Sequence, residues 1–514
     1  MIGRENKTMS VVEHVPGGPA GGGAPRPISV MGERVSVAAI FLVYLLLQMN
    51  AIHHGSYAGQ DFHRNKTIII EASADPIAAL THLVYVGRGF PTLYHLLGAK
   101  LYLLVGKPHY LPALAYFNLG INLIALGAFY GVIRLVLASA VMRVAWLAWT
   151  AFLPLFVIPS LVIASDAAPG IFFTLLVWLN ILALDRNRSL RSGTLLMSAM
   201  AVVLVLMVMI KMNYAMCIVA ELIILIVLAA ARSLARRQII LGLVLLVLLP
   251  LAASATLYKL YLRAQIASSC LENRDQIPPE ISRMSLRSFL FFRPTDRELL
   301  EAPYFHELKN MGNGFARPLH INNYYSYPGM LPLAMFTDVL NMYQPIVYAS
   351  DAPGIVDEYY TRVRPPENKL RMQWALKLGL IFYFAGFILI PGMILSLLLR
   401  ALTVRFEEPD RVLGILAALS SCVVSGMALT LLFVLWPYVK ASWLPRFCWP
   451  AHLGLFVLVF AALERWVVRK IPNFRWGILA VALVQAALNI AFLWVPGNPT
   501  VLPSVEIVDQ PVPS

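Results

Sequence analysis

The sequence predicts an all-α polytopic membrane protein, and three observations lead to this fold class. Hydrophobic residues make up 59% of the 514 residues and charged residues only 13%, whereas a soluble protein surface is far richer in charge. The mean hydropathy is +0.71, and the apolar residues are gathered in long runs. Basic residues recur in every second connection between these runs, as expected for a chain that crosses a membrane repeatedly.

Each apolar run is interpreted as one helix that crosses the bilayer. A hydrocarbon core of roughly 30 Å requires about 20 apolar helical residues per crossing. On this basis the sequence predicts about eleven crossings, at residues 35–52, 112–136, 142–161, 169–184, 194–211, 214–231, 238–260, 372–400, 411–436, 447–464 and 476–495.

The orientation follows from the basic connections, because Lys and Arg are retained on the cytoplasmic side. These residues precede the first crossing or follow the fourth, sixth, eighth and tenth, as in Arg4, Lys7, Arg26, Arg34, Arg186, Arg188, Arg191, Arg232, Arg236, Arg237, Arg400, Arg405, Arg411, Arg465, Arg469, Lys470 and Arg475. The sequence therefore predicts a multi-pass protein of the cell (inner) membrane, with a cytoplasmic N-terminus and an extracytoplasmic C-terminus. The net charge of +14 is dispersed over many loops, so it indicates contact with lipid headgroups and no nucleic-acid partner.

The chain divides into five predicted regions. Residues 1–34 are rich in Gly and Pro and are expected to form a disordered cytoplasmic leader. An N-terminal transmembrane module at 35–260 includes a first outer loop at 53–111, and an extracytoplasmic loop domain follows at 261–371. A C-terminal transmembrane module at 372–495 precedes an outer tail at 496–514. Two long outer segments on a helical bundle are where we expect a functional site.

The first outer loop carries an unusual group of polar residues. It contains Gln60-Asp61-Phe62-His63-Arg64 near its start and Arg88-Gly89-Phe90-Pro91 later on. An acid and several bases at the outer mouth of a membrane protein indicate a reaction site. Elsewhere, Cys217, Cys270, Cys422 and Cys448 are scattered and do not form a disulfide framework or a metal cluster.

The order of motifs resembles the GT-C superfamily of membrane glycosyltransferases, of the protein mannosyltransferase or aminoarabinose transferase type. Four features carry the resemblance: Asp61, the segment Phe90-Pro91-Thr92-Leu93-Tyr94-His95-Leu96-Leu97, the segment Ser165-Asp166-Ala167-Ala168-Pro169, and the late segment Trp443-Leu444-Pro445-Arg446-Phe447-Cys448-Trp449-Pro450. The resemblance implies transfer of a sugar from a polyprenyl-phosphate-linked donor to an envelope lipid, glycan or protein acceptor on the extracytoplasmic face.

The sequence also departs from the pattern of that superfamily. Asp61 is followed by Phe62 and His63, where many members place a second acid, and Phe90 stands where a Lys or His often precedes the Pro pair. No Trp-Trp-Asp string is present, which disfavours the oligosaccharyltransferase branch. No Asp-x-Asp pair occurs in the first outer loop, so no metal ligands and no cofactor are predicted.

The expected chemistry assigns roles to six residues. Transfer needs a base that takes the proton from the attacking hydroxyl, and a carboxylate can serve; Asp61 and Asp166 are the candidate catalytic residues for an inverting hexosyl or pentosyl transfer. Charge develops on the departing phosphate, and fixed cationic donors can stabilise it. The candidate donor-phosphate ligands are Arg64, Arg88, Arg446 and His63.

Other interpretations of these residues stay open from sequence alone. Asp61 can instead pair with Arg64 or cap a helix, Asp166 can be a helix N-cap, and the arginines can reach from the membrane boundary to water. A secondary transporter, a lipid flippase, or an O-antigen-type ligase or polymerase has comparable apolar spans. Transport, however, does not require an outer domain of this length, and no internal repeat is detectable in the sequence.

Overall fold

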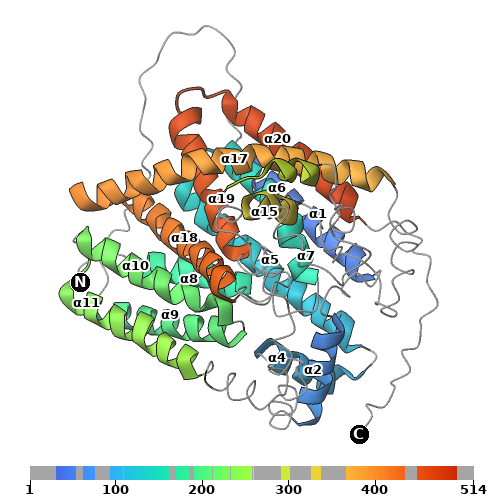
Figure 1. Cartoon of the computed structure of the whole chain (residues 1–514), viewed down its shortest axis with the longest axis horizontal. Helices are drawn as coiled ribbons and strands as arrows, with labels where there is room; N and C mark the ends of the chain where they lie inside the picture. The colour runs from blue at the N-terminus through green and yellow to red at the C-terminus, as the bar shows by residue number, and fades with distance from the viewer. Residues whose placement is uncertain are drawn as a thin grey trace, which may run out of the picture.

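The structure is a computed structural model that describes residues 30–53, 62–75, 93–107, 109–161, 169–183, 190–210, 212–231, 233–256, 259, 291–300, 326–336, 366–434 and 449–494 (Figure 1). Within these ranges the chain is helical and contains no strand. The predicted all-α fold class is therefore confirmed. The predicted outer tail, most of the predicted leader and most of the segment 261–371 lie outside the described residues.

The first part of the bundle is made of helices that follow one another with short connections. They are α1 (Val30–His53), α5 (Tyr110–Val136), α6 (Ala140–Ala151), α7 (Pro154–Leu161), α8 (Pro169–Ala183), α9 (Leu190–Ile210), the 3-10 turn η1 (Met212–Ala215), α10 (Met216–Ala230), α11 (Arg236–Gly242) and its π-helical continuation η2 (Leu243–Leu248). Helix α1 begins at Val30, so its first turn lies in the stretch predicted as leader.

The second part contains the long helix α17 and three further spans. The elements are α17 (Pro366–Thr403), α18 (Glu408–Val434), α19 (Trp449–Leu463) with its π-helical end η9 (Glu464–Val468), and α20 (Phe474–Leu493). The 38 residues of α17 correspond to about 57 Å of helix, which exceeds the hydrocarbon core, and Figure 1 shows α17 extending across the bundle.

Eight of the eleven predicted crossings fall on described helices that are long and apolar enough to span a bilayer, so the predicted count of eleven is not confirmed. The other three are α8 and α10, of 15 residues each, and the segment predicted at 142–161. That segment is broken between α6 and α7 at Phe152 and Leu153. The cause is Pro154, which lacks an amide hydrogen and disfavours helical geometry at the preceding residue. The chain is a multi-pass membrane protein by these criteria.

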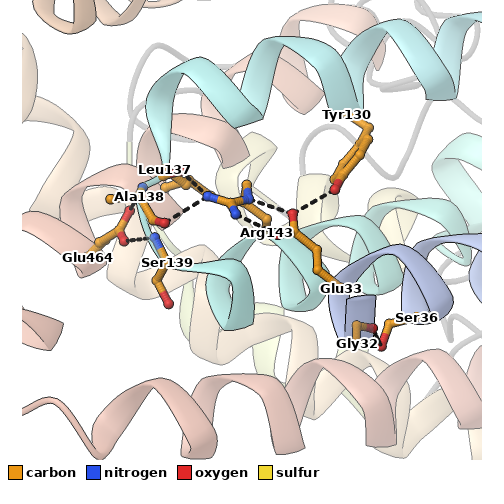
Figure 2. Close-up of polar contacts among 9 residues, drawn as sticks. All are labelled: Gly32, Glu33, Ser36, Tyr130, Leu137, Ala138, Ser139, Arg143 and Glu464. Atoms are coloured by element: carbon orange, nitrogen blue, oxygen red, sulfur yellow. Dashed lines mark hydrogen bonds and ion pairs between the residues drawn. The ribbon is translucent and has the colours of Figure 1, made fainter. Parts of the chain in front are cut away.

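Several connections that are basic in sequence meet at one end of the bundle. Arg143 in the first turn of α6 pairs with Glu33 on α1, and Glu464 of η9 accepts hydrogen bonds from the amides of Ala138 and Ser139 at 3.1 and 2.6 Å (Figure 2). At the same end of α19, Asp410 of α18 binds Arg400 and Arg465. We call this the charged end of the bundle.

The core of the bundle is centred on Trp149, near the end of α6. Its indole Nε1 donates to Gln485 Oε1 of α20 at 2.5 Å, and Gln485 in turn donates to the carbonyl of Ala375 on α17. Phe456 of α19 lies edge-on to Trp149, with 4.4 Å between ring centroids. These contacts join α6, α17, α19 and α20, which come from both halves of the chain.

A short apolar helix from the second outer segment, α15 (Tyr327–Phe336), enters this core. Its last residue, Phe336, is fully buried and packs against Trp149 and Phe456. The 3-10 turn η5 (Pro294–Leu300) supports its start, because Asp296 accepts from the Ser326 amide at 2.8 Å. Tyr383 of α17 also donates to the Pro328 carbonyl. The part of the predicted second outer segment that forms α15 is therefore anchored inside the bundle.

Candidate active site

Most of the predicted site residues lie outside the part of the chain that the structure describes. Asp61, Arg88, Asp166 and Arg446 fall in this category. His63 and Arg64 lie on the first turn of α2 (Phe62–Ala74), but their side chains are not among those described. The helices that immediately follow these residues are described, and their packing shows which of these helices are neighbours.

The helix that follows Asp61 is held tightly against the helix that follows Arg88. Helix α2 begins one residue after Asp61, and α4 (Leu93–Val105) begins five residues after Arg88. The buried side chains of His95 and Asn65 form a hydrogen bond of 2.7 Å between Nε2 and Oδ1. Near the other end of the contact, a side chain at Gly98 would lie 2.9 Å from Ile69. Helices α2 and α4 are thus packed as one compact pair.

This helix pair is attached to the start of α5. The amide of Asn118 donates to the hydroxyl of Tyr94 at 3.0 Å, and both side chains are buried. Tyr102 lies edge-on to Tyr110 with 5.0 Å between ring centroids. Burial raises the pKa of Tyr94 above its ordinary value, and the hydrogen bond from Asn118 opposes that shift. Tyr94 is therefore a neutral phenol at physiological pH that fixes α4 on the bundle.

The helices that follow Asp166 and Arg446 are neighbours of each other. Helices α8 and α19 each begin three residues after these positions. A Cβ atom at Gly454, in the second turn of α19, would lie 3.8 Å from the ring of Phe173 in α8 and against the hydroxyl of Ser420 in α18. Glycine is required here because the three helices approach one another closely.

Both groups of helices pack on α5, but at different depths. Tyr94 contacts α5 at Asn118, whereas Phe173 contacts it at Phe129, with 6.4 Å between ring centroids. Eleven residues of helix separate these two points, which corresponds to about 16 Å along the axis. The structure therefore places α4 at one level of α5 and α8 at another.

A polar cluster that was not predicted from the sequence lies within the bundle and is formed by Tyr44, Gln48 and Asn122. The amides of Gln48 and Asn122 both donate to the Tyr44 hydroxyl, at 3.0 and 2.9 Å. They also donate to carbonyls of α7, namely Val157 at 3.2 Å and Phe156 at 3.3 Å. Helix α7 precedes Asp166 in sequence, so the cluster holds the helix that comes before this residue. The signal was available, since uncharged amides inside apolar spans are costly unless hydrogen-bonded.

No group of three or more His, Cys, Asp or Glu side chains that could hold a metal occurs among the described residues. Asp61 and Asp166 are outside the residues searched, so the expectation of metal-free chemistry stays a prediction. His95 contributes to the packing between α2 and α4, as its buried hydrogen bond with Asn65 shows.

No profile of a known family matches the chain, and no curated protein matches it. Among solved structures, it resembles the Archaeoglobus fulgidus oligosaccharyltransferase AglB, in complex with an inhibitory peptide and a dolichol-phosphate (TM-score 0.47, 12% identity, 91% of this chain and 56% of that chain). An oligosaccharyltransferase from the same organism in its apo form gives a TM-score of 0.47 at 14% identity, with 92% and 57% covered. ArnT from Cupriavidus metallidurans bound to undecaprenyl phosphate gives 0.37 at 14% identity, with 91% and 77% covered.

The chain spans little more than half the length of the two oligosaccharyltransferases. With TM-scores below 0.5, these likenesses assign neither an activity nor a residue role to this chain.

Proposed function

We propose that the protein is a membrane glycosyltransferase that takes a sugar from a polyprenyl-phosphate-linked donor and transfers it to an envelope acceptor on the extracytoplasmic face. One observation carries the proposal. The helices that begin within or just after the four motif segments form two packed pairs, α2 with α4 and α8 with α19, and α4 and α8 each contact α5. Helices that are far apart in sequence thus pack around one helix.

In the proposed reaction, Asp61 accepts the proton of the acceptor hydroxyl as its oxygen attacks the anomeric carbon. The bond between that carbon and the phosphate oxygen breaks, and the polyprenyl phosphate leaves. Arg64, in the first turn of α2, follows Asp61 by three residues, and residues at this spacing are neighbours wherever both belong to one helix. The guanidinium fork of Arg64, Arg88 or Arg446 matches the oxygens of the departing phosphate, and His63 is a further donor.

The described contacts support this proposal by holding the reacting segments in place. The bond between Asn65 and His95 lies in the first turns of α2 and α4, close in sequence to Asp61, His63 and Arg64. The cluster of Tyr44, Gln48 and Asn122 likewise holds α7, the helix that precedes Asp166 in sequence. A catalytic group must be positioned by neighbours that are themselves fixed, and these contacts meet that requirement.

The test is a transfer assay with the purified full-length protein in lipid nanodiscs and a radiolabelled polyprenyl-phosphate sugar. The expected result is consumption of the donor with release of polyprenyl phosphate, and transfer that persists in excess EDTA. Activity lost with EDTA and restored by magnesium or manganese would overturn the metal-free chemistry. Movement of intact donor across sealed liposomes without cleavage would replace the transferase by a flippase.

A further inference from the structure

A cavity lies at the charged end of the bundle. Its volume is about 310 Å³, within the range of small-ligand pockets. It is formed by the starts of α1, α6 and α20, and its walls include Val30, Glu33, Val141, Arg143 and Arg475. Two of these residues are apolar and three are charged, so the lining of the cavity is partly apolar and partly charged.

Glu33 and Arg143 neutralise each other within the wall of the cavity. Arg143 donates from Nε and Nη2 to the two carboxylate oxygens of Glu33, at 2.7 and 2.6 Å, and from Nη1 to the carbonyls of Leu137 and Ala138 (Figure 2). The hydroxyl of Tyr130 donates to Glu33 at 2.6 Å. These two charges are therefore already engaged by protein groups.

Arg475 is the remaining cation of the wall, and its charge is not balanced in the described part of the chain. No carboxylate of the described residues lies within ion-pair distance, and its Nε is shielded from water without a hydrogen-bond partner there. It occupies the first turn of α20, where the helix dipole disfavours a positive charge. A guanidinium group without a carboxylate partner can bind two oxygens of an anion such as a phosphate.

The position of the cavity indicates where such a phosphate comes from. Val30 and Arg475 stand at the starts of α1 and α20, both long and apolar enough to span the bilayer, so the cavity lies at the depth of the lipid headgroups. Trp476 lies beside Arg475, with 5.9 Å between the guanidinium carbon and the ring centroid, and such pairs are typical of the membrane interface. Val30 is 70% exposed and offers an apolar surface to an acyl chain.

We propose that this cavity binds the phosphate of an anionic membrane lipid, with Arg475 as the cationic ligand and Val30 against the upper part of the acyl chains. By the charge pattern of the sequence this is the cytoplasmic end. The site is therefore distinct from the proposed site of transfer, and its lipid is a structural or regulatory ligand rather than the sugar donor.

The experiment measures lipid retention by native mass spectrometry of the full-length protein in detergent, titrated with phosphatidylglycerol or phosphatidylcholine. The variant is Arg475→Gln, and Lys470→Gln is the matched control, because Lys470 is exposed, carries the same charge and lies at the same end outside the cavity wall. Arg475→Gln is expected to weaken phosphatidylglycerol binding about tenfold, the loss of one charge-assisted contact. Lys470→Gln is expected to leave it unchanged.

Equal losses in the two variants, or equal retention of both lipids by the wild type, would overturn the proposal. Displacement of phosphatidylglycerol by excess inorganic phosphate would assign the cavity to a soluble anion and overturn the lipid as its ligand. If Arg475→Gln does not fold, Arg475→Lys is measured instead. It keeps the charge but cannot make the two-pronged contact, so it should bind the lipid less tightly than the wild type, and unchanged binding would contradict the proposal.

Discussion

Glu33 and Arg143 are separated by 110 residues of sequence and form a two-pronged ion pair, with Nε to Oε1 at 2.7 Å and Nη2 to Oε2 at 2.6 Å. Their side chains are only 8% and 15% exposed. Arg143 also binds the carbonyls that follow α5, and Tyr130 of α5 binds Glu33. This single pair therefore joins α1, α5 and α6 at the charged end of the bundle (Figure 2).

Replacement of Glu33 by Gln is expected to destabilise the protein by about 3 kcal/mol, because it leaves a largely buried guanidinium without its counter-charge. The measurement is denaturant unfolding in detergent. The control is Glu407→Gln, since Glu407 is exposed to solvent. Exposed charges contribute about 0.5 kcal/mol in an ion pair. Equal losses in the two variants would contradict the assignment of Glu33 as a structural anchor.

Truncation of Phe336 to Ala is expected to cost about 3 to 5 kcal/mol, because its fully buried ring fills the space between Trp149 and Phe456. Phe291→Ala is the control, since Phe291 is 62% exposed. Limited proteolysis of the second outer segment should become faster for Phe336→Ala alone. Unchanged proteolysis would show that α15 is not held by this ring.

The close approach of α18 and α19 predicts a reciprocal pair of substitutions. Gly454→Ala places a methyl group against the hydroxyl of Ser420 and is expected to lower the melting temperature. Ser420→Ala in the same chain removes the clashing oxygen and leaves Cβ atoms about as close as the 3.5 Å found for an ideal Cβ at Gly454, which is ordinary contact. The double variant should therefore be more stable than Gly454→Ala. Additive losses would argue against this packing.

Asn65→Ala is expected to reduce turnover about 100-fold, because a catalytic segment displaced by about 1 Å loses activity on that scale. The change removes the partner of buried His95 in the first turns of α2 and α4. Ser73→Ala, near the far end of α2, removes only a bond to its own helix at Ile70 and serves as the control. Full turnover in Asn65→Ala would show that this contact does not position Asp61.

Apolar runs and alternating basic connections predicted the helices well, because the bilayer demands helical segments of fixed length and retains Lys and Arg on one side. The interruption at Pro154 was also visible in the sequence, although it was interpreted as part of one crossing. Pairings such as Trp149 with Gln485, 336 residues apart, follow from packing of the whole bundle and have no local signal.

The contacts around the candidate site could be predicted from the sequence only in part, for a related reason. Asp61 and Arg64 are three residues apart in sequence, and their roles stay predictions. The contact between α8 and α19, by contrast, depends on the small volume of Gly454, and the polar support of α7 depends on Gln48 and Asn122 from two separate spans. A residue that acts by supporting another is recognised only once the helices are assembled.

The most direct test of the central proposal is the turnover of Asp61→Asn with a polyprenyl-phosphate sugar, measured beside Asp75→Asn. Asp75 lies exposed just beyond the other end of α2, so the control makes the same chemical change on the same segment. Loss of a general base should reduce turnover of Asp61→Asn roughly 100- to 10,000-fold, with donor binding and folding retained. Asp75→Asn should keep full activity. Near wild-type turnover of Asp61→Asn would contradict the account.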